Sequence, residues 1–212
     1  MQWGEPINWT GWKPVLSIQD VPDAGTLTPE GVLLTRELLS QSMVFNGVGY
    51  HRHPNGGGWV ASTAYVSQRA YVGFFAEIHD YAIIGDQAMV YHDSRVLGRA
   101  NIKGRAQVFG RAEVCGFALV EDFARVYDNG HVHDGARVGE NAQVSDRAEI
   151  FGEAHLCGNS HALGDDLFMG MPFERRDIRP NMKLWLEKRE EERRRSSLKP
   201  GPWKRFLLRI AG

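Results

Sequence analysis

The chain is poor in cysteine, and none of its apolar runs is long. Two cysteines, Cys115 and Cys157, among 212 residues are too few for the dense disulfide framework of a small secreted scaffold. No apolar run approaches the ~20 residues that a transmembrane helix needs. The first residues also lack the charged and apolar regions of a secretory signal. We therefore expect a cytoplasmic protein with reduced cysteines.

The chain also lacks an excess of charge of either sign, but the two signs are unevenly distributed. Lysine and arginine total 25, and aspartate and glutamate total 26. Residues 193–212 hold seven basic side chains and no acidic one, so the other 192 residues carry 18 − 26 = −8. Because hydrophobic residues make up 42% and charged residues 24%, the composition indicates a globular protein rather than a disordered one.

Residues 58–165 repeat a six-residue pattern eighteen times without an insertion or deletion. The first position is Ala in fourteen hexads, and the third is Val, Ile or Leu in seventeen. Side chains alternate along a strand, so positions one and three face inward and position two faces outward. Position five is often Gly or Asp, which tolerate left-handed backbone angles at corners. The pattern predicts a solenoid whose short repeats bury a core by stacking.

The repeat resembles the hexapeptide-repeat superfamily, as in the run of residues 136–144, ARVGENAQV. The entry to the array, residues 57–60, resembles the start of uncharacterised bacterial and prophage proteins of this kind. The resemblance implies an all-β solenoid, a left-handed parallel β-helix with three hexads per coil and thus six coils of eighteen residues. Val90 should then pair with Val72 and Val108.

The segments outside the repeat predict a cap, a plug and a tail. Residues 1–57 are expected to form an N-terminal cap, with a helix opened by Thr28 and Pro29 and a tight hairpin at Asn46-Gly47. Residues 166–179 are expected to plug the last coil. Residues 180–212 are expected to form a charged helix and a basic amphipathic tail.

Two enzymatic activities occur in the superfamily that the repeat resembles. Its acyltransferases use a histidine base, for which His131, His155 and His161 are the outward-facing candidates here, although the repeat has no inserted loop to shape a cleft. Its γ-class carbonic anhydrases bind zinc through three histidines, two of them two coils apart. No two histidines of this chain are 36 residues apart, so we expect no cofactor and no bound zinc.

Two further groups of residues are weaker candidates for chemistry. His51 and His53 precede a glycine-rich turn and are candidate metal ligands, but no third ligand is evident. Cys115 and His133 are eighteen residues apart, so they are expected to lie one above the other, where a thiolate and an imidazole could interact. A connecting loop and a corner of mixed residues are the alternatives.

Columns appear when the sequence is folded at eighteen residues. Trp59, Glu77, Arg95, Glu113, His131 and Glu149 form an outward column of alternating charge, which indicates a solvated wall. Tyr91, Phe109 and Tyr127 form an aromatic corner ladder. The ladder predicts an oligomer or docking surface, and coverage by the chain's own terminal segments is the alternative.

The basic tail has an amphipathic pattern that predicts a partner-binding segment. The candidate contact residues are Trp203, Arg205, Phe206, Leu207, Arg209 and Ile210. Ten residues are too few for a stable free helix, so the apolar stripe needs a surface. That surface is the chain's own acidic solenoid, a groove of a partner protein, or an anionic membrane or nucleic acid.

These observations together predict a non-catalytic scaffold or protein-interaction module. It binds a protein partner or copies of itself as a homo-oligomer, for which a trimer is one arrangement. The alternative is an acyltransferase acting on a small molecule or nucleotide sugar, because a fold does not fix a function.

Overall fold

The computed structural model describes residues 9 and 12–170. The chain divides into two compact units, Met1–Met171 and Pro172–Gly212. The predicted charged helix and basic tail, with Trp203, Arg205, Phe206, Leu207, Arg209 and Ile210, lie outside the described residues, as does most of the predicted plug.

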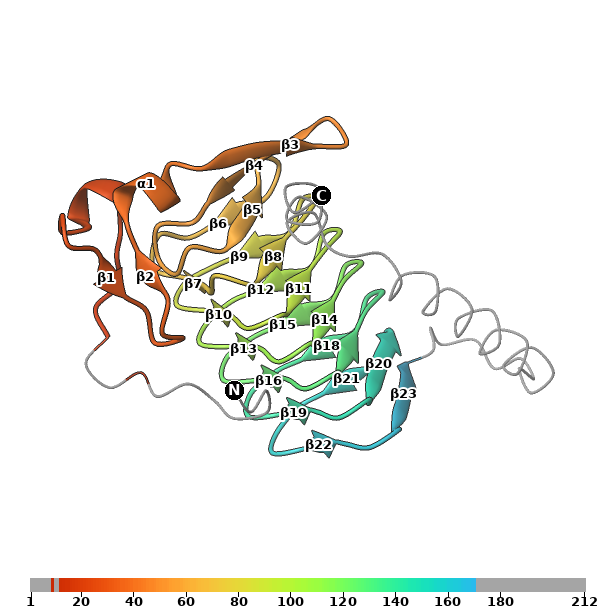
Figure 1. The fold of residues 1–212 in the computed structure, drawn as a ribbon. Helices are drawn as coiled ribbons and strands as arrows, with labels where there is room; N and C mark the ends of the chain where they lie inside the picture. Colours follow the sequence, from red (N-terminus) through yellow and green to blue (C-terminus); the bar gives the residue numbers. More distant parts are fainter. Residues whose placement is uncertain (1–8, 10–11, 171–212) are drawn as a thin grey trace. The chain divides into compact units, whose positions relative to one another are not determined.

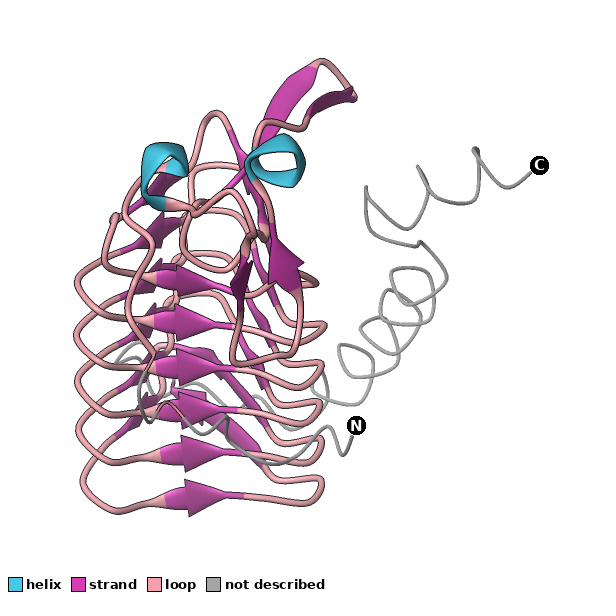
Figure 2. Ribbon diagram, turned by 60° about the vertical axis from the view of Figure 1, so that its left-hand side comes forward, coloured by secondary structure: helices cyan, strands magenta, loops and turns pink. Residues whose placement is uncertain are grey.

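Residues 59–170 form a parallel β-solenoid of about six turns, in which short strands stack coil upon coil along three walls (Figures 1 and 2). Wall 1 consists of β5 (Trp59–Ala61), β8 (Glu77–Ile78), β11 (Arg95–Val96), β14 (Glu113–Val114), β17 (His131–Val132), β20 (Glu149–Gly152) and β23 (Leu167–Gly170). Wall 2 consists of β6 (Tyr65–Val66), β9 (Ile83–Ile84), β12 (Asn101–Ile102), β15 (Leu119–Val120), β18 (Arg137–Val138) and β21 (His155–Leu156). Wall 3 consists of β7 (Tyr71–Val72), β10 (Met89–Val90), β13 (Gln107–Val108), β16 (Arg125–Val126), β19 (Gln143–Val144) and β22 (His161–Ala162).

The register between coils is eighteen residues, as the resemblance to hexapeptide-repeat proteins implies. Val90 pairs in parallel with Val72 and with Val108. Positions one and three line the interior, and Ala100 and Ile102 are both 0% exposed. The interior has room for Ala at the first position and takes a β-branched residue at the third, whose stiff side chain suits a pleated wall.

Corner aspartates tie neighbouring coils together. Asp80 has a φ of 53°, and its Oδ2 accepts a hydrogen bond from the backbone N–H of Gly98 at 2.9 Å. The same bond spans eighteen residues at four other corners, where the acceptors are Asp86, Asp122, Asp134 and Asp146. Asp tolerates the left-handed region better than most residues, and here its carboxylate also satisfies an amide of the next coil.

The segment before the coils contains η1 (Ile18–Asp20), β1 (Thr26–Leu27), β2 (Leu33–Leu34), α1 (Arg36–Leu39), β3 (Ser42–Phe45) and β4 (Val48–Arg52). The predicted hairpin is confirmed, because β3 and β4 pair antiparallel around Asn46 and Gly47, which both have positive φ. Strand β4 then pairs antiparallel with β5. The hairpin therefore extends wall 1 beyond the first coil (Figure 1).

The predicted helix start at Thr28 is wrong. Thr28 Oγ1 accepts a hydrogen bond from the N–H of Val32, and the segment turns so that β1 pairs antiparallel with β2. The helix α1 begins later, with Thr35 as its N-cap accepting from the N–H of Leu38 at 3.2 Å. A Thr-Pro pair fits a turn as well as a helix start, and Gly31, with a φ of 80°, favours the turn.

The aromatic ladder is stacked, and part of the N-terminal segment packs on it. The Tyr91 and Phe109 rings lie 4.9 Å apart and the Phe109 and Tyr127 rings 5.1 Å apart, nearly parallel in both cases. Trp9 packs edge-on against Tyr91 at 5.6 Å. Tyr91 and Phe109 are buried, whereas Tyr127 is partly exposed. The chain therefore covers its own ladder at the Tyr91 end, which is the alternative that the sequence left open.

Glu30 connects the N-terminal segment to the first two coils. Its carboxylate accepts hydrogen bonds from the Tyr71 hydroxyl and from the N–H groups of Phe74 and His92. The side chain is buried, 4% exposed, and burial is the largest cause of its raised pKa. Three donors on one carboxylate fix the segment against the coils.

Candidate functional site on wall 1

The outer face of wall 1 carries a mixed cluster of carboxylate, thiol and imidazole groups. Val114, Val132 and Ile150 face the core, so their neighbours on either side face outward by strand alternation. The strand pairing places Glu113 beside His131, and His131 beside Glu149. The outward residues that gather here are Glu113, Cys115, His131, His133 and Glu149.

The outward side chains follow a diagonal of sixteen residues. A fourth-position side chain contacts the second-position side chain of the next coil in five pairs: Tyr91 with Gln107, Cys115 with His131, Tyr127 with Gln143, His133 with Glu149, and Ser145 with His161. Positions two and four share a face, and the fourth-position side chain leans toward the following coil. Outward groups therefore meet along this diagonal as well as along the vertical column, which pairs Arg95 with Glu113 and Glu113 with His131.

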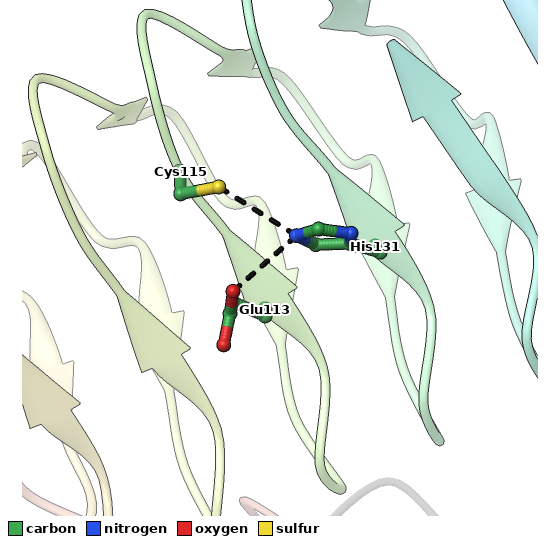
Figure 3. A group of neighbouring side chains, drawn as sticks. All are labelled: Glu113, Cys115 and His131. Atoms are coloured by element: carbon green, nitrogen blue, oxygen red, sulfur yellow. Dashed lines mark hydrogen bonds and ion pairs between the residues drawn. The ribbon is translucent and has the colours of Figure 1, made fainter. Parts of the chain in front are cut away.

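Figure 3 shows the first group, Glu113, Cys115 and His131, converging from β14 and β17. The His131 Nε2 atom lies 3.6 Å from Cys115 Sγ and 3.3 Å from Glu113 Oε1. The other carboxylate oxygen of Glu113 forms an ion pair with Arg95 at 3.2 Å. The imidazole nitrogen is thus held between a sulfur and a carboxylate oxygen.

The second group, His131, His133 and Glu149, is more buried. His133 is 1% exposed and Glu149 6%. The Nε2 atom of His133 lies 2.6 Å from Glu149 Oε1, and its Nδ1 atom lies 3.1 Å from Asp134. Phe151 stacks on the His133 ring at 5.3 Å. His133 is therefore fixed between carboxylates, while Glu149 Oε1 also approaches His131 Nδ1 at 3.9 Å.

These contacts extend one sequence-based interpretation and correct another. The Cys115 sulfur contacts His131 of the diagonal, whereas the sequence paired it with His133 of its own column. The column from Trp59 to Glu149 is not a uniformly solvated wall, because Trp59, Glu77 and Glu149 are buried. Folding the sequence at sixteen as well as eighteen residues would have brought the group together.

A third histidine lies on the same face near the hairpin. The Tyr50 hydroxyl, on β4, lies 3.0 Å from His79 Nδ1, and His79 Nε2 lies 2.9 Å from Glu77 Oε2. All three side chains are buried. Burial raises the pKa of Tyr50, with the charges of Asp80 and Glu77 adding to the effect. This chain of polar groups joins the hairpin to the first coils.

His51 and His53 lie on β4 and in the turn that follows. His51 is exposed. His53 is buried, and its Nδ1 lies 3.2 Å from the carbonyl oxygen of Asn55. Burial lowers the pKa of His53 to about 4, so the ring is neutral at pH 7. Between them, the Arg52 guanidinium lies 4.0 Å from the centre of the Trp59 ring and 4.3 Å from that of Phe74. Neither histidine belongs to the two ligand groups found in residues 12–170.

The other histidine candidates lie apart from the cluster. His155 is exposed on β21 of wall 2. His161 is exposed on β22 of wall 3, where its Nε2 lies 2.9 Å from the Ser145 hydroxyl and 3.3 Å from the Tyr127 hydroxyl. Neither cysteine is part of a disulfide bond. Of the three outward histidines, His131 is therefore the one that the structure brings to a thiol.

The side chains of the Cys-His-Glu group could bind a metal ion, and they could also act in nucleophilic catalysis. Thiolate, imidazole and carboxylate are all zinc ligands, and a Cys-His pair is also the basis of nucleophilic catalysis. Searches found no protein-family model, curated protein or solved structure that matches this chain. Among the described residues, no helix is long and apolar enough to cross a membrane.

Proposed function

We propose that this chain is a self-associating β-solenoid of the left-handed hexapeptide-repeat type, which acts as a scaffold by binding copies of itself through wall 2. The coil of eighteen residues, the three walls and the alternation of Ala and Val in the core support the type of solenoid. The exposed apolar surface of wall 2 supports the self-association. A density map that traced right-handed coils would refute the first part.

The surface lies on wall 2 and on the corner that leads into it from wall 1. Tyr65, Tyr81 and Phe117 are 63%, 60% and 69% exposed, and Ile83 is 41% exposed. The Arg99 guanidinium lies 5.9 Å from the ring centres of both Tyr81 and Phe117, so it bridges the two rings. Large exposed aromatic side chains gathered on one face are typical of a protein interface.

The distribution of side chains along wall 2 favours a second copy of the chain in a parallel orientation. The outward residues of the first two coils, Tyr65 and Ile83, are apolar, whereas those of the last two, Arg137 and His155, are polar. Parallel copies around a rotation axis place residues of equal height together, so apolar residues meet apolar ones. An antiparallel pair at full overlap would place apolar residues against Arg137. A cyclic assembly such as a trimer satisfies this condition.

The mass of the assembly in solution tests the proposal. Multi-angle light scattering and sedimentation over a range of concentrations should give an oligomer for the full chain. Phe117→Glu should reduce the mass of the assembly, because it places a carboxylate in the interface. The free subunit should tolerate the substitution, because Arg99 lies close enough to pair with the new carboxylate. Val44→Glu is the matched control, because Val44 is 76% exposed on the hairpin.

A monomer at every concentration, or an oligomer unchanged in both Phe117→Glu and Tyr65→Glu, would refute self-association through wall 2. Acyl transfer from acyl-coenzyme A that is lost in a single variant, such as His155→Ala, would instead support the acyltransferase alternative.

A further inference from the structure

The Cys-His-Glu group on wall 1 has the geometry of a transition-metal site. We propose that Glu113 Oε1, Cys115 Sγ and His131 Nε2 bind one Zn²⁺ ion. The three atoms lie within 4.8 Å of one another and come from two adjacent coils whose strands β14 and β17 pair in register. The positions of the three Cβ atoms are therefore fixed by the solenoid itself.

Two of the three distances within the group match the edges of a zinc tetrahedron. With Zn–N near 2.05 Å, Zn–O near 2.0 Å and Zn–S near 2.3 Å, tetrahedral angles give edges of about 3.3 Å for N to O and about 3.6 Å for N to S. The observed separations are 3.3 Å from Glu113 Oε1 to His131 Nε2 and 3.6 Å from Cys115 Sγ to the same nitrogen. A direct N–H···O hydrogen bond is shorter, near 2.9 Å.

The second group supports the site without ligating the same ion. The 2.6 Å between His133 Nε2 and Glu149 Oε1 is too short for two ligands of one tetrahedral ion and is a hydrogen bond. Glu149 Oε1 also lies 3.9 Å from His131 Nδ1, which is too far for a direct hydrogen bond, so Glu149 contributes a nearby negative charge. Arg95 forms an ion pair with the other oxygen of Glu113 at 3.2 Å, and such partners of a ligand help to orient it.

The ligand types select the metal and leave room for a further ligand. Thiolate and imidazole favour zinc and similar transition metals over Mg²⁺ and Ca²⁺, which prefer oxygen ligands. Three protein ligands are one fewer than a structural zinc tetrahedron has, so water or another group completes the coordination. The His131 and Glu113 side chains are 14% and 28% exposed, so the group is neither sealed in the core nor fully solvated.

Zinc titration of the full chain, stripped of metal with a chelator, tests the proposal. Competition with a chromophoric chelator should show saturable binding of one Zn²⁺ per chain. Cys115→Ser, His131→Ala and Glu113→Gln should each weaken this binding by at least about tenfold, because each loses a ligand. Cys157→Ser and His155→Ala are matched controls, since both residues are exposed on wall 2 or its corner, and they should bind as the wild type does.

Alkylation of the two cysteines provides a readout that does not depend on the variants. Zinc should slow the reaction of Cys115 with iodoacetamide, as measured by peptide mass, and should leave Cys157 unaffected. Circular dichroism of each variant separates a lost ligand from a lost fold.

Three results would overturn the proposal. They are the absence of saturable one-to-one binding to the folded wild type, binding of unchanged affinity in folded Cys115→Ser, and zinc that is lost in His51→Ala instead. The last would place the ion at the hairpin turn. None of these results depends on the oligomeric state, so they test the metal site separately from the scaffold function.

Discussion

The solenoid carries two aromatic corner columns that differ in their surroundings. Tyr91, Phe109 and Tyr127 stack at the corner between wall 3 and wall 1, and Trp9 packs on Tyr91. Tyr81 and Phe117 lie at the corner between wall 1 and wall 2, separated by Arg99, and both are exposed. Tyr91 and Phe109 of the first column are therefore buried, whereas Tyr81 and Phe117 of the second column lie on the surface.

The difference shows that the repeat determines the core and leaves the outer face free to vary. Inward positions obey the same steric rule in every coil, so Ala and Val recur in all three walls. Outward aromatic residues recur every eighteen or thirty-six residues without that constraint. Whether such a column is buried depends on what the rest of the chain places on it, here Trp9, Trp12 and Glu30 on the corner after wall 3.

Truncation of one ring in each column should give the largest contrast. Phe109 is 1% exposed and Phe117 is 69% exposed. Phe109→Ala should lower the free energy of unfolding by about 3–5 kcal/mol, because it opens a cavity between stacked rings. At protein concentrations too low for self-association, Phe117→Ala should change it by less than about 0.5 kcal/mol. Chemical denaturation of both variants measures the contrast, and equal effects would show that the two columns do not differ in burial.

Lowering the pH should reduce the free energy of unfolding through His53, which lies in the turn before the first coil. His53 has a folded pKa of about 4, below the ordinary value of about 6.5, so the unfolded chain binds the proton more tightly. Its contribution to stability is therefore complete above about pH 6.5 and is lost as the pH falls toward 4, by up to roughly 3 kcal/mol. Comparison of wild type and His53→Gln by thermal unfolding across this range isolates the effect. Parallel pH profiles for the two proteins would contradict it.

Removal of the charge at Glu30 should loosen the contact between the N-terminal segment and the coils. The carboxylate accepts from three donors with both oxygens, whereas the amide of Glu30→Gln has one acceptor oxygen. At least one buried donor loses its partner, at a cost of about 1–3 kcal/mol. Thermal unfolding at pH 7 measures the loss. A more stable variant would mean that the burial of charge, which raises the pKa of Glu30, outweighs the hydrogen bonds.

A small loss of stability is expected when the charge of Arg99, on the exposed column, is removed. Arg99→Met keeps an unbranched apolar side chain between Tyr81 and Phe117 but removes the positive charge 5.9 Å from each ring centre. The loss in unfolding free energy should be about 0.5 kcal/mol, as for exposed cation–π contacts. Arg105→Met, which affects the contact with Phe123 alone, is the control and should cost less. A loss of unfolding free energy larger than that of Glu30→Gln would show that Tyr81, Arg99 and Phe117 are not an exposed surface group.

The sequence predicted the solenoid well because the core depends on local rules. The hexads and their alternation indicated stacked strands, and the three hexads per coil that the resemblance implies placed Val90 between Val72 and Val108. Asn46-Gly47 was enough for the hairpin. The outer face was harder to predict, because an outward side chain can turn toward several neighbours. Cys115 reaches His131 along the diagonal because its side chain leans toward the next coil.

The N-terminal segment was harder still. A Thr-Pro pair is compatible with a helix start and with a turn, and the pairing of β1 with β2 decides in favour of the turn. That pairing is a tertiary property, which no local pattern at Thr28 specifies.

The corner bonds of Asp80 and its counterparts give the solenoid a direction of growth during synthesis. In each, an aspartate of the earlier coil accepts from an amide eighteen residues later, so a finished coil offers its acceptors to the coil that follows. Ribosomes add roughly 5–20 residues per second, so one coil takes about 1–4 s to emerge. A β-hairpin forms in about 1–10 μs, and although parallel pairing is slower, a coil has seconds in which to dock. We therefore expect each new coil to dock on the completed coil before the next one is synthesised. The order of synthesis, and not a search for the correct partner among similar repeats, then sets the order in which the coils fold.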